Sequence, residues 1–238
     1  MTRPGIFYGV GVGPGDPELI TLKAIRVISS AAVLAIPKSE GGAESQALAI
    51  VNRAMPLDGK ETLELSFPMT KDSAALDASR RQAAALIAER LCRGQDVAFI
   101  TLGDPLLYST FSYLMPFVKE LSPDTEIRAV PGITSFSAAA SLIPAALAET
   151  DSKVIIIPAA YDLDRVKEAL SYADTVVILK VNRAIDKLID LIADAGLSKG
   201  SFFVSRAGWP QEEVVTNLEE LRGKKPDYFS MLIVRKNV

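Results

Sequence analysis

The sequence predicts an α/β protein, because short apolar runs typical of strands alternate along the chain with longer segments of helical periodicity. The first alternation is the clearest: the apolar residues 6–8 lead through a glycine-rich loop at 9–17 into a helical pattern at 18–28. A second observation is the run at 97–102, which is almost entirely apolar, as in a strand covered on both faces. Strands separated by helices favour parallel pairing, so we expect a layered α/β domain.

Each predicted element follows from a local pattern, and the two halves of the chain differ in their connections. In the first half we expect strands at 5–10, 32–36, 63–66, 96–102 and 126–130, and helices at 17–29, 44–54, 73–92, 106–120 and 133–143. In the second half we expect strands at 153–158, 174–180, 201–206 and 228–235, and helices at 162–170, 184–194 and 217–222. Only a loop and a short helix separate the last two strands, which favours a mixed sheet.

The region between 132 and 152 contains the predicted domain boundary. A proline–glycine pair at 131–132 opens it, and a helix of small residues and Pro144 follow. We therefore expect two α/β domains, 1–136 and 137–238, the first with a mostly parallel sheet and the second with a mixed sheet. One continuous domain is the alternative.

The composition excludes several classes of chemistry. None of the 238 residues is a histidine, which removes the His-assisted hydrolases and most zinc sites, so we expect no protein-bound metal. The single cysteine, Cys92, excludes an internal disulfide, and its place at the end of an alanine-rich helix predicts a buried structural thiol. The net charge of −3 without a basic tail argues against a nucleic-acid partner. Neither a membrane-spanning run nor a signal peptide is visible, so we expect no membrane partner and a cytoplasmic location.

The loop at 9–17 matches neither of the two common phosphate-binding patterns. The dinucleotide fingerprint requires a third glycine where this chain has Pro14 or Asp16, and the P-loop requires a Gly-Lys-Ser/Thr ending that is absent here. Pro14 lacks an N–H donor, and Asp16 would repel a phosphate. The loop therefore favours a ligand without phosphate; the alternative is a tight turn between strand and helix that binds nothing.

Three predicted strands of the first half end in similar loops, which contain Pro14, Asp104 and Thr134. Because the carboxyl ends of parallel strands meet at the same edge of a sheet, these loops should converge. A carboxylate, small hydroxyls and apolar neighbours without a phosphate loop suit S-adenosylmethionine. Asp104 can instead, or in addition, cap a helix that starts at Pro105. The hydroxyls at 134–135 can equally mark the start of a helix.

The three loops together resemble the tetrapyrrole methylase family, S-adenosylmethionine-dependent enzymes that methylate corrin and sirohaem precursors. Residues 11–24 are similar to the opening signature of the family, 103–105 to its central motif and 131–136 to its third motif. Residues 8–24, 106–111 and 179–181 are similar to the branch that methylates carbon 20 of precorrin-2 or cobalt-factor II in cobalamin biosynthesis.

The resemblance implies a homodimer of two-domain chains with the cofactor S-adenosylmethionine in the cleft between the domains. The positions that match the cofactor contacts of the family are Pro14, Leu102, Gly103, Asp104, Leu107, Tyr108, Ser109, Thr110, Thr134, Ser135, Lys180 and Ala207. Ala207 stands where relatives often have glycine, and Lys180 where some have methionine.

Methyl transfer from a sulfonium requires orientation of the acceptor carbon and removal of one proton. The candidate proton acceptors are Tyr108, Asp104 and Glu149, and the sequence does not rank them. Basic side chains should bind the carboxylates of the tetrapyrrole, and the candidates are Lys38, Arg80, Lys180, Arg183 and Arg206.

Several other functions remain open from the sequence. Within the family they are methylation of uroporphyrinogen III, of another precorrin position, of ribosomal RNA or of a diphthamide precursor. From other classes they are a nicotinamide-dependent oxidoreductase and a non-catalytic nucleotide-binding module. The oxidoreductase lacks support because the second strand runs into Pro37 and Lys38 rather than into an acidic residue.

Overall fold

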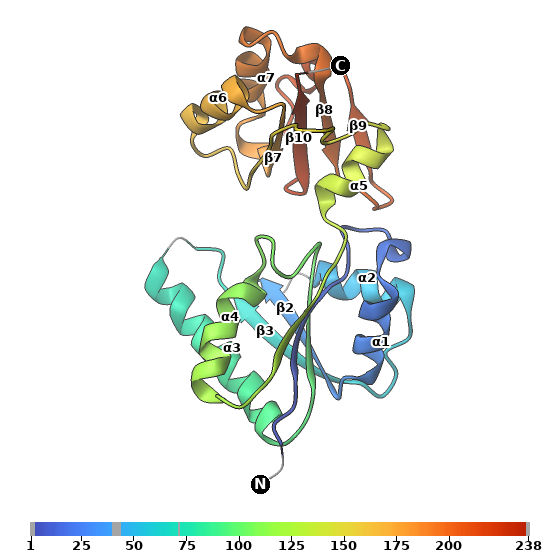
Figure 1. The fold of residues 1–238 in the computed structure, drawn as a ribbon, viewed down its shortest axis with the longest axis vertical. Helices are drawn as coiled ribbons and strands as arrows, with labels where there is room; N and C mark the ends of the chain where they lie inside the picture. The colour runs from blue at the N-terminus through green and yellow to red at the C-terminus, as the bar shows by residue number, and fades with distance from the viewer. Residues whose placement is uncertain (1–2, 40–43, 71, 237–238) are drawn as a thin grey trace. The chain divides into compact units, whose positions relative to one another are not determined.

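The computed structural model describes residues 3–39, 44–70 and 72–236. The chain divides into two compact units, Met1–Thr134 and Ser135–Val238, here called unit 1 and unit 2 (Figure 1). The division falls two residues before the boundary expected from the sequence. Each unit contains a five-stranded sheet, and the predicted α/β class is confirmed.

The sheet of unit 1 is entirely parallel and has the strand order β3-β2-β4-β1-β5. Its strands are β1 (Phe7–Gly11), β2 (Val33–Ser39), β3 (Glu61–Phe67), β4 (Val97–Thr101) and β5 (Ile127–Val130). Every residue of the central strand β4 is buried, as its apolar sequence predicts. The parallel order places the carboxyl ends of all five strands along one edge.

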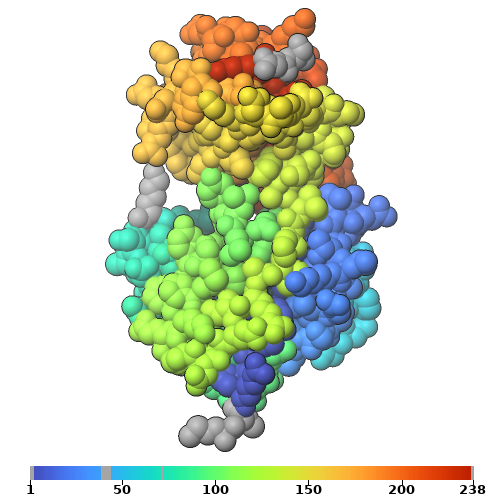
Figure 2. Space-filling view, viewed as in Figure 1, coloured from blue at the N-terminus to red at the C-terminus, as the bar shows by residue number. Residues whose placement is uncertain are grey.

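Helices cover both faces of this sheet, with α1 and α2 on one side and α3 and α4 on the other (Figure 1). The bounds are α1 (Leu22–Ser30), α2 (Gln46–Ala54), α3 (Ser73–Cys92) and α4 (Thr110–Leu121). Figure 2 shows the green segment that includes α4 in the middle of the visible face of unit 1. The apolar sides of α3 and α4 pack on the sheet around Phe7, Phe99 and Phe111.

Two predicted helices of unit 1 begin four or more residues later than the sequence suggests. The segment expected at 17–29 forms a 3₁₀ turn at Pro17–Leu19, capped by Asp16, before α1 begins behind the cap Thr21. The helix expected from 106 begins only at Thr110. In both places a proline follows an aspartate, which favours a helix start, but the aspartate closes only a local turn.

The sheet of unit 2 is mixed, as predicted, with the strand order β6-β7-β10-β8-β9. Its strands are β6 (Val154–Ile157), β7 (Thr175–Leu179), β8 (Ser201–Ser205), β9 (Glu213–Val215) and β10 (Ser230–Arg235). β6 and β7 are parallel, and the other pairs are antiparallel. The short strand β9 is missing from the sequence-based prediction, because three residues that begin with a glutamate give no recognisable alternation.

The helices of unit 2 are α5 (Ser135–Leu142), α6 (Leu163–Tyr172) and α7 (Ile185–Asp194). α6 and α7 pack their apolar sides on the sheet through Val166, Leu188 and Ile192. The predicted helix at 217–222 is a single 3₁₀ turn, Leu218–Leu221. Among the described residues no helix is both long and apolar enough to cross a membrane.

The prediction of a buried Cys92 is wrong, because this residue is exposed. It lies at the last position of α3. The preceding residue, Leu91, fills the core position instead. A shift of one residue on a helix turns a side chain by about 100°, which decides between core and solvent.

Candidate functional site

Three glycines bring the loops after β1, β4 and β5 together at the carboxyl edge of the unit 1 sheet. Gly11 ends β1, Gly103 follows β4 and Gly132 follows β5; we call these residues the glycine junction. A Cβ on Gly132 would lie 2.1 Å from the carbonyl oxygen of Gly103, and a Cβ on Gly11 would lie 2.4 Å from the same oxygen. The backbones are therefore closer than any side chain permits. The predicted convergence of the three loops is confirmed.

The carboxylate of Asp104 joins two of these loops. Its Oδ1 accepts a hydrogen bond from the backbone N–H of Leu106 at 2.9 Å, and its Oδ2 accepts one from the N–H of Gly132 at 3.1 Å. The N–H of Gly103 also donates to the carbonyl of Gly13 at 2.8 Å, which joins the loops after β4 and β1. The predicted role of Asp104 as the N-cap of a helix is wrong, because no helix starts there; the side chain holds the site loops in place.

The N-cap of α4 is Ser109, whose hydroxyl both accepts and donates a hydrogen bond within unit 1. Its Oγ accepts a hydrogen bond from the N–H of Phe111 at 3.2 Å and donates one to Thr101 Oγ1 at 3.0 Å, and this contact is buried. The neighbouring Tyr108 has a left-handed backbone with φ of 53° and a side chain that is 54% exposed. Such a conformation costs a non-glycine residue about 1–2 kcal/mol. The loop therefore places Tyr108 on the surface of the site edge under strain.

The structure brings the predicted cofactor residues of unit 1 together on this edge. They lie in the loops that follow β1, β4 and β5 and are Pro14, Leu102, Gly103, Asp104, Leu107, Tyr108, Ser109, Thr110 and Thr134. Pro14 and Ser109 are buried, and the others are partly or fully exposed. Two apolar side chains stand among them, with Leu106 57% and Ile133 37% exposed. Backbone groups, a carboxylate, hydroxyls and apolar surface make an edge suited to a nucleoside without phosphate.

The predicted site residues of unit 2 lie at two ends of its sheet. Lys180 and Ala207 follow β7 and β8, and Ser135 begins α5. Glu149 precedes β6, which is parallel to β7, so it lies at the opposite end of the sheet from Lys180. Its backbone forms a turn with Ser152 and its side chain is solvent-exposed. Glu149 is therefore not grouped with the other predicted residues of unit 2.

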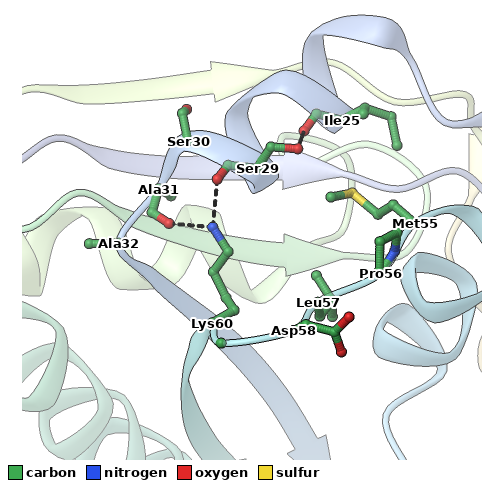
Figure 3. Close-up of a pocket in the computed structure, with 11 residues that line it drawn as sticks. Ile25, Ser29, Ser30, Ala31, Ala32, Met55, Pro56, Leu57, Asp58 and Lys60 are labelled. Atoms are coloured by element: carbon green, nitrogen blue, oxygen red, sulfur yellow. Dashed lines mark hydrogen bonds between the residues drawn. The ribbon is translucent and has the colours of Figure 1, made fainter.

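A pocket of about 640 Å³ lies at the other edge of unit 1, away from the strand carboxyl ends (Figure 3). Lys60 stands in it, and its Nζ donates to the carbonyls of Ser29 and Ala31, each at 2.7 Å. These carbonyls belong to the end of α1, where an ammonium group satisfies free acceptors. Burial lowers the pKa of Lys60. None of the motifs singled out in the sequence reaches this pocket, and Lys60 has a structural role there.

Carboxylates already pair with three of the five basic residues proposed for substrate binding. The pairs are Lys38 with Glu64, Arg80 with Asp77, and Arg206 with Asp227. Arg183 is exposed, and Lys180 lies over the ring of Tyr228. The sequence did not indicate Gly132 as a contact or Asp227 and Tyr228 as neighbours of these cations. The Pro131-Gly132 pair could have indicated the contact of Gly132. No local sequence pattern indicates Asp227 or Tyr228.

The fold and the site edge define a class: a two-unit α/β protein in which glycine-rich loops converge at the carboxyl edge of a parallel sheet. The family model described as tetrapyrrole (corrin/porphyrin) methylases matches residues 7–222. The chain therefore belongs to the tetrapyrrole methylase family, and the resemblance stated from the sequence is confirmed.

Two relatives and one solved structure show how far the similarity extends. The chain is 32% identical to the cobalt-precorrin-2 C(20)-methyltransferase of Salmonella typhimurium, over 98% of this chain and 97% of the relative. It is 36% identical to the probable cobalt-precorrin-2 C(20)-methyltransferase of Methanocaldococcus jannaschii, over 96% of this chain and 95% of the relative. Uroporphyrin-III C-methyltransferase from Thermus thermophilus, solved with S-adenosylhomocysteine, has a TM-score of 0.67 at 22% identity and 98% coverage of both chains.

Proposed function

We propose that this protein transfers a methyl group from S-adenosylmethionine to carbon 20 of precorrin-2 or its cobalt-bearing form, in cobalamin biosynthesis. The observation that carries the proposal is the similarity over nearly the whole chain to two relatives named for this reaction. The loops at the edge of unit 1 match no common phosphate-binding pattern. This favours S-adenosylmethionine as the cofactor, since it has a ribose, an adenine and an amino acid but no phosphate.

The residues of the edge fit this cofactor in kind. The glycine junction lets the three loop backbones approach one another closely, and Leu106 and Ile133 offer apolar surface for a flat base. Thr134, which directly precedes α5, adds a hydroxyl group. We propose the unit 1 positions given above as cofactor contacts, with Ser109 acting through its backbone because its hydroxyl caps α4. The resemblance adds Ser135, Lys180 and Ala207 of unit 2.

Bound S-adenosylmethionine supplies an electrophilic methyl group, and the protein contributes mainly orientation. We assign Asp104 to positioning, because both of its carboxylate oxygens already accept backbone hydrogen bonds from the site loops. Tyr108 is then the proton acceptor we propose, since its side chain is presented on the site edge. Glu149 is not supported as the proton acceptor, because it lies at the opposite end of the unit 2 sheet from Lys180.

We also propose a cytoplasmic homodimer, on the strength of the family resemblance alone. Sedimentation at micromolar concentration tests the assembly, and a monomer would contradict it.

The decisive experiment measures transfer of a labelled methyl group to precorrin-2 with and without inserted cobalt, followed by NMR of the product. A methyl group at carbon 20 is expected. A methyl group at carbon 11 or 17, or on RNA, would place the chain in another branch of the family. Calorimetry with S-adenosylhomocysteine and with nicotinamide dinucleotides separates the methyltransferase from an oxidoreductase.

A further inference from the structure

One end of the unit 2 sheet brings two cations together with two aromatic rings. Lys180 directly follows β7 and Arg206 directly follows β8, the two strands that flank β10. Their N–H groups donate to the carbonyls of Ser230 and Phe229, each at 2.8 Å. Tyr228 directly precedes Phe229 and Ser230 in the chain. We call Lys180, Arg206, Asp227, Tyr228 and Phe229 the cation–aromatic end.

Both basic residues are held in an unfavourable backbone conformation. Lys180 has φ of 54° and Arg206 has φ of 49°, in the left-handed region that favours glycine. The conformation costs a residue with a side chain about 1–2 kcal/mol. Strain of this kind persists where the surrounding structure enforces it, and it is concentrated at ligand sites. Two strained cations at the ends of the strands that flank β10 therefore point to a role in binding.

The charges of the two cations differ in availability. The Nε and Nη2 of Arg206 donate to Asp227 Oδ2 at 3.0 and 2.8 Å, so this guanidinium is neutralised. Asp227 is itself fixed, because its Oδ1 accepts from the N–H of Phe229 at 2.8 Å. The Nζ of Lys180 has no carboxylate within 4.0 Å among the residues that the structure describes. Lys180 is therefore the uncompensated charge of the cation–aromatic end.

The rings beside Lys180 add a partly exposed apolar surface. Its Nζ lies 5.4 Å from the centroid of the Tyr228 ring, within reach of a cation–π contact. The Tyr228 ring meets Phe229 edge-on at 5.3 Å and is fixed by it, while Tyr228 itself remains 40% exposed. An uncompensated ammonium group next to a fixed ring suits a ligand that is flat, apolar on its faces and anionic at its rim.

We propose that the cation–aromatic end binds the carboxylate-bearing rim of the tetrapyrrole, with Lys180 Nζ as the carboxylate ligand and Tyr228 as the surface for the macrocycle. The inference rests on the proposed function, because the tetrapyrrole has this chemistry. In this proposal Lys180 has two roles. Its backbone is the proposed cofactor contact, and its side chain sets the affinity and orientation of the substrate.

The test compares variants that change the charge, the conformation or neither. Lys180→Met keeps the aliphatic stem over Tyr228 and removes the charge, and Lys180→Arg restores a cation. Lys180→Gly removes the side chain and relieves the strain, so its melting temperature should be no lower than that of the wild type. Lys167→Met is the matched control, because this lysine is exposed on α6 and lies outside the cation–aromatic end.

Binding is measured by absorbance titration with cobalt-factor II and by calorimetry with S-adenosylhomocysteine. We expect Lys180→Met and Lys180→Gly to weaken cobalt-factor II binding about tenfold, the size of one contact with a charged group. Binding of S-adenosylhomocysteine should change less than about twofold, a smaller effect than the loss of one hydrogen bond. Lys180→Arg should recover most of the affinity, and Lys167→Met should match the wild type. Added salt should weaken the wild type more than Lys180→Met.

Unchanged affinity of Lys180→Met for cobalt-factor II would overturn the inference, and so would an equal loss for both ligands, which would assign the side chain to the cofactor. A wild type that binds S-adenosylhomocysteine but not cobalt-factor II would instead refute the proposed substrate, and with it the inference.

Discussion

Replacement of Gly132 by alanine tests whether the glycine junction builds the site. The backbone of Gly132 lies outside the left-handed region, so alanine is tolerated by its dihedral angles and the effect is purely steric. The added Cβ would meet the Gly103 oxygen at 2.1 Å and the Gly11 Cα at 2.8 Å. Since ordinary contacts begin near 3.4 Å, the loops must separate by more than 1 Å.

The size of the effect follows from that displacement. Forcing a methyl group into a packed site costs about 1–3 kcal/mol of unfolding free energy. A misplacement of about 1 Å can reduce activity by about 10²-fold, because orientation carries much of the catalysis. We therefore expect Gly132→Ala to remain folded, to unfold at lower urea concentration, and to bind S-adenosylhomocysteine at least about tenfold more weakly, with a loss of methyl transfer of about 10²-fold.

Urea denaturation and calorimetry with S-adenosylhomocysteine measure the two effects separately. Gly59→Ala is the matched control, because Gly59 has φ of 71° and no atom within 4 Å of its added Cβ. It should lose about 1 kcal/mol through strain alone and keep its cofactor affinity. If Gly132→Ala bound the cofactor as the wild type does, the junction would be a packing feature and the proposed site would be wrong.

Three further changes have distinct expected outcomes. Asp104→Ala removes the acceptor of two backbone hydrogen bonds, so unfolding free energy should fall by about 1–2 kcal/mol and cofactor affinity should fall with it; unchanged affinity in calorimetry would limit Asp104 to stability. Lys60→Met should cost about 1 kcal/mol in urea denaturation and leave cofactor binding intact, because it uncaps only α1. Arg128 lowers the pKa of Glu126 by hydrogen bonding, so the stabilisation is present above the ordinary value of 4.5 and is lost as the pH falls through the lower, folded-state pKa. Melting curves of Glu126→Gln should therefore lie below the wild type at neutral pH and converge with it in acid; a constant offset would show that charge is not involved.

The sequence by itself determined the type and order of nearly all elements and the edge of the sheet on which the candidate loops converge. Helical and strand periodicities are local properties, so α3 could be predicted at 73–92, the bounds that the structure gives it. The convergence of the loops with Pro14, Asp104 and Thr134 followed from parallel pairing, which needs only the alternation of strands and helices.

Only the tertiary structure decided which atoms meet within that edge. Asp104 reads as a helix cap in the sequence, but its second oxygen binds the N–H of Gly132, 28 residues away. Lys180 and Tyr228 are neighbours only because β7 and β10 pair. Contacts of this kind depend on strand register and on how closely backbones approach, and neither leaves a periodic signal in the chain. Local propensity therefore specified the elements, and long-range pairing specified the chemistry of the site.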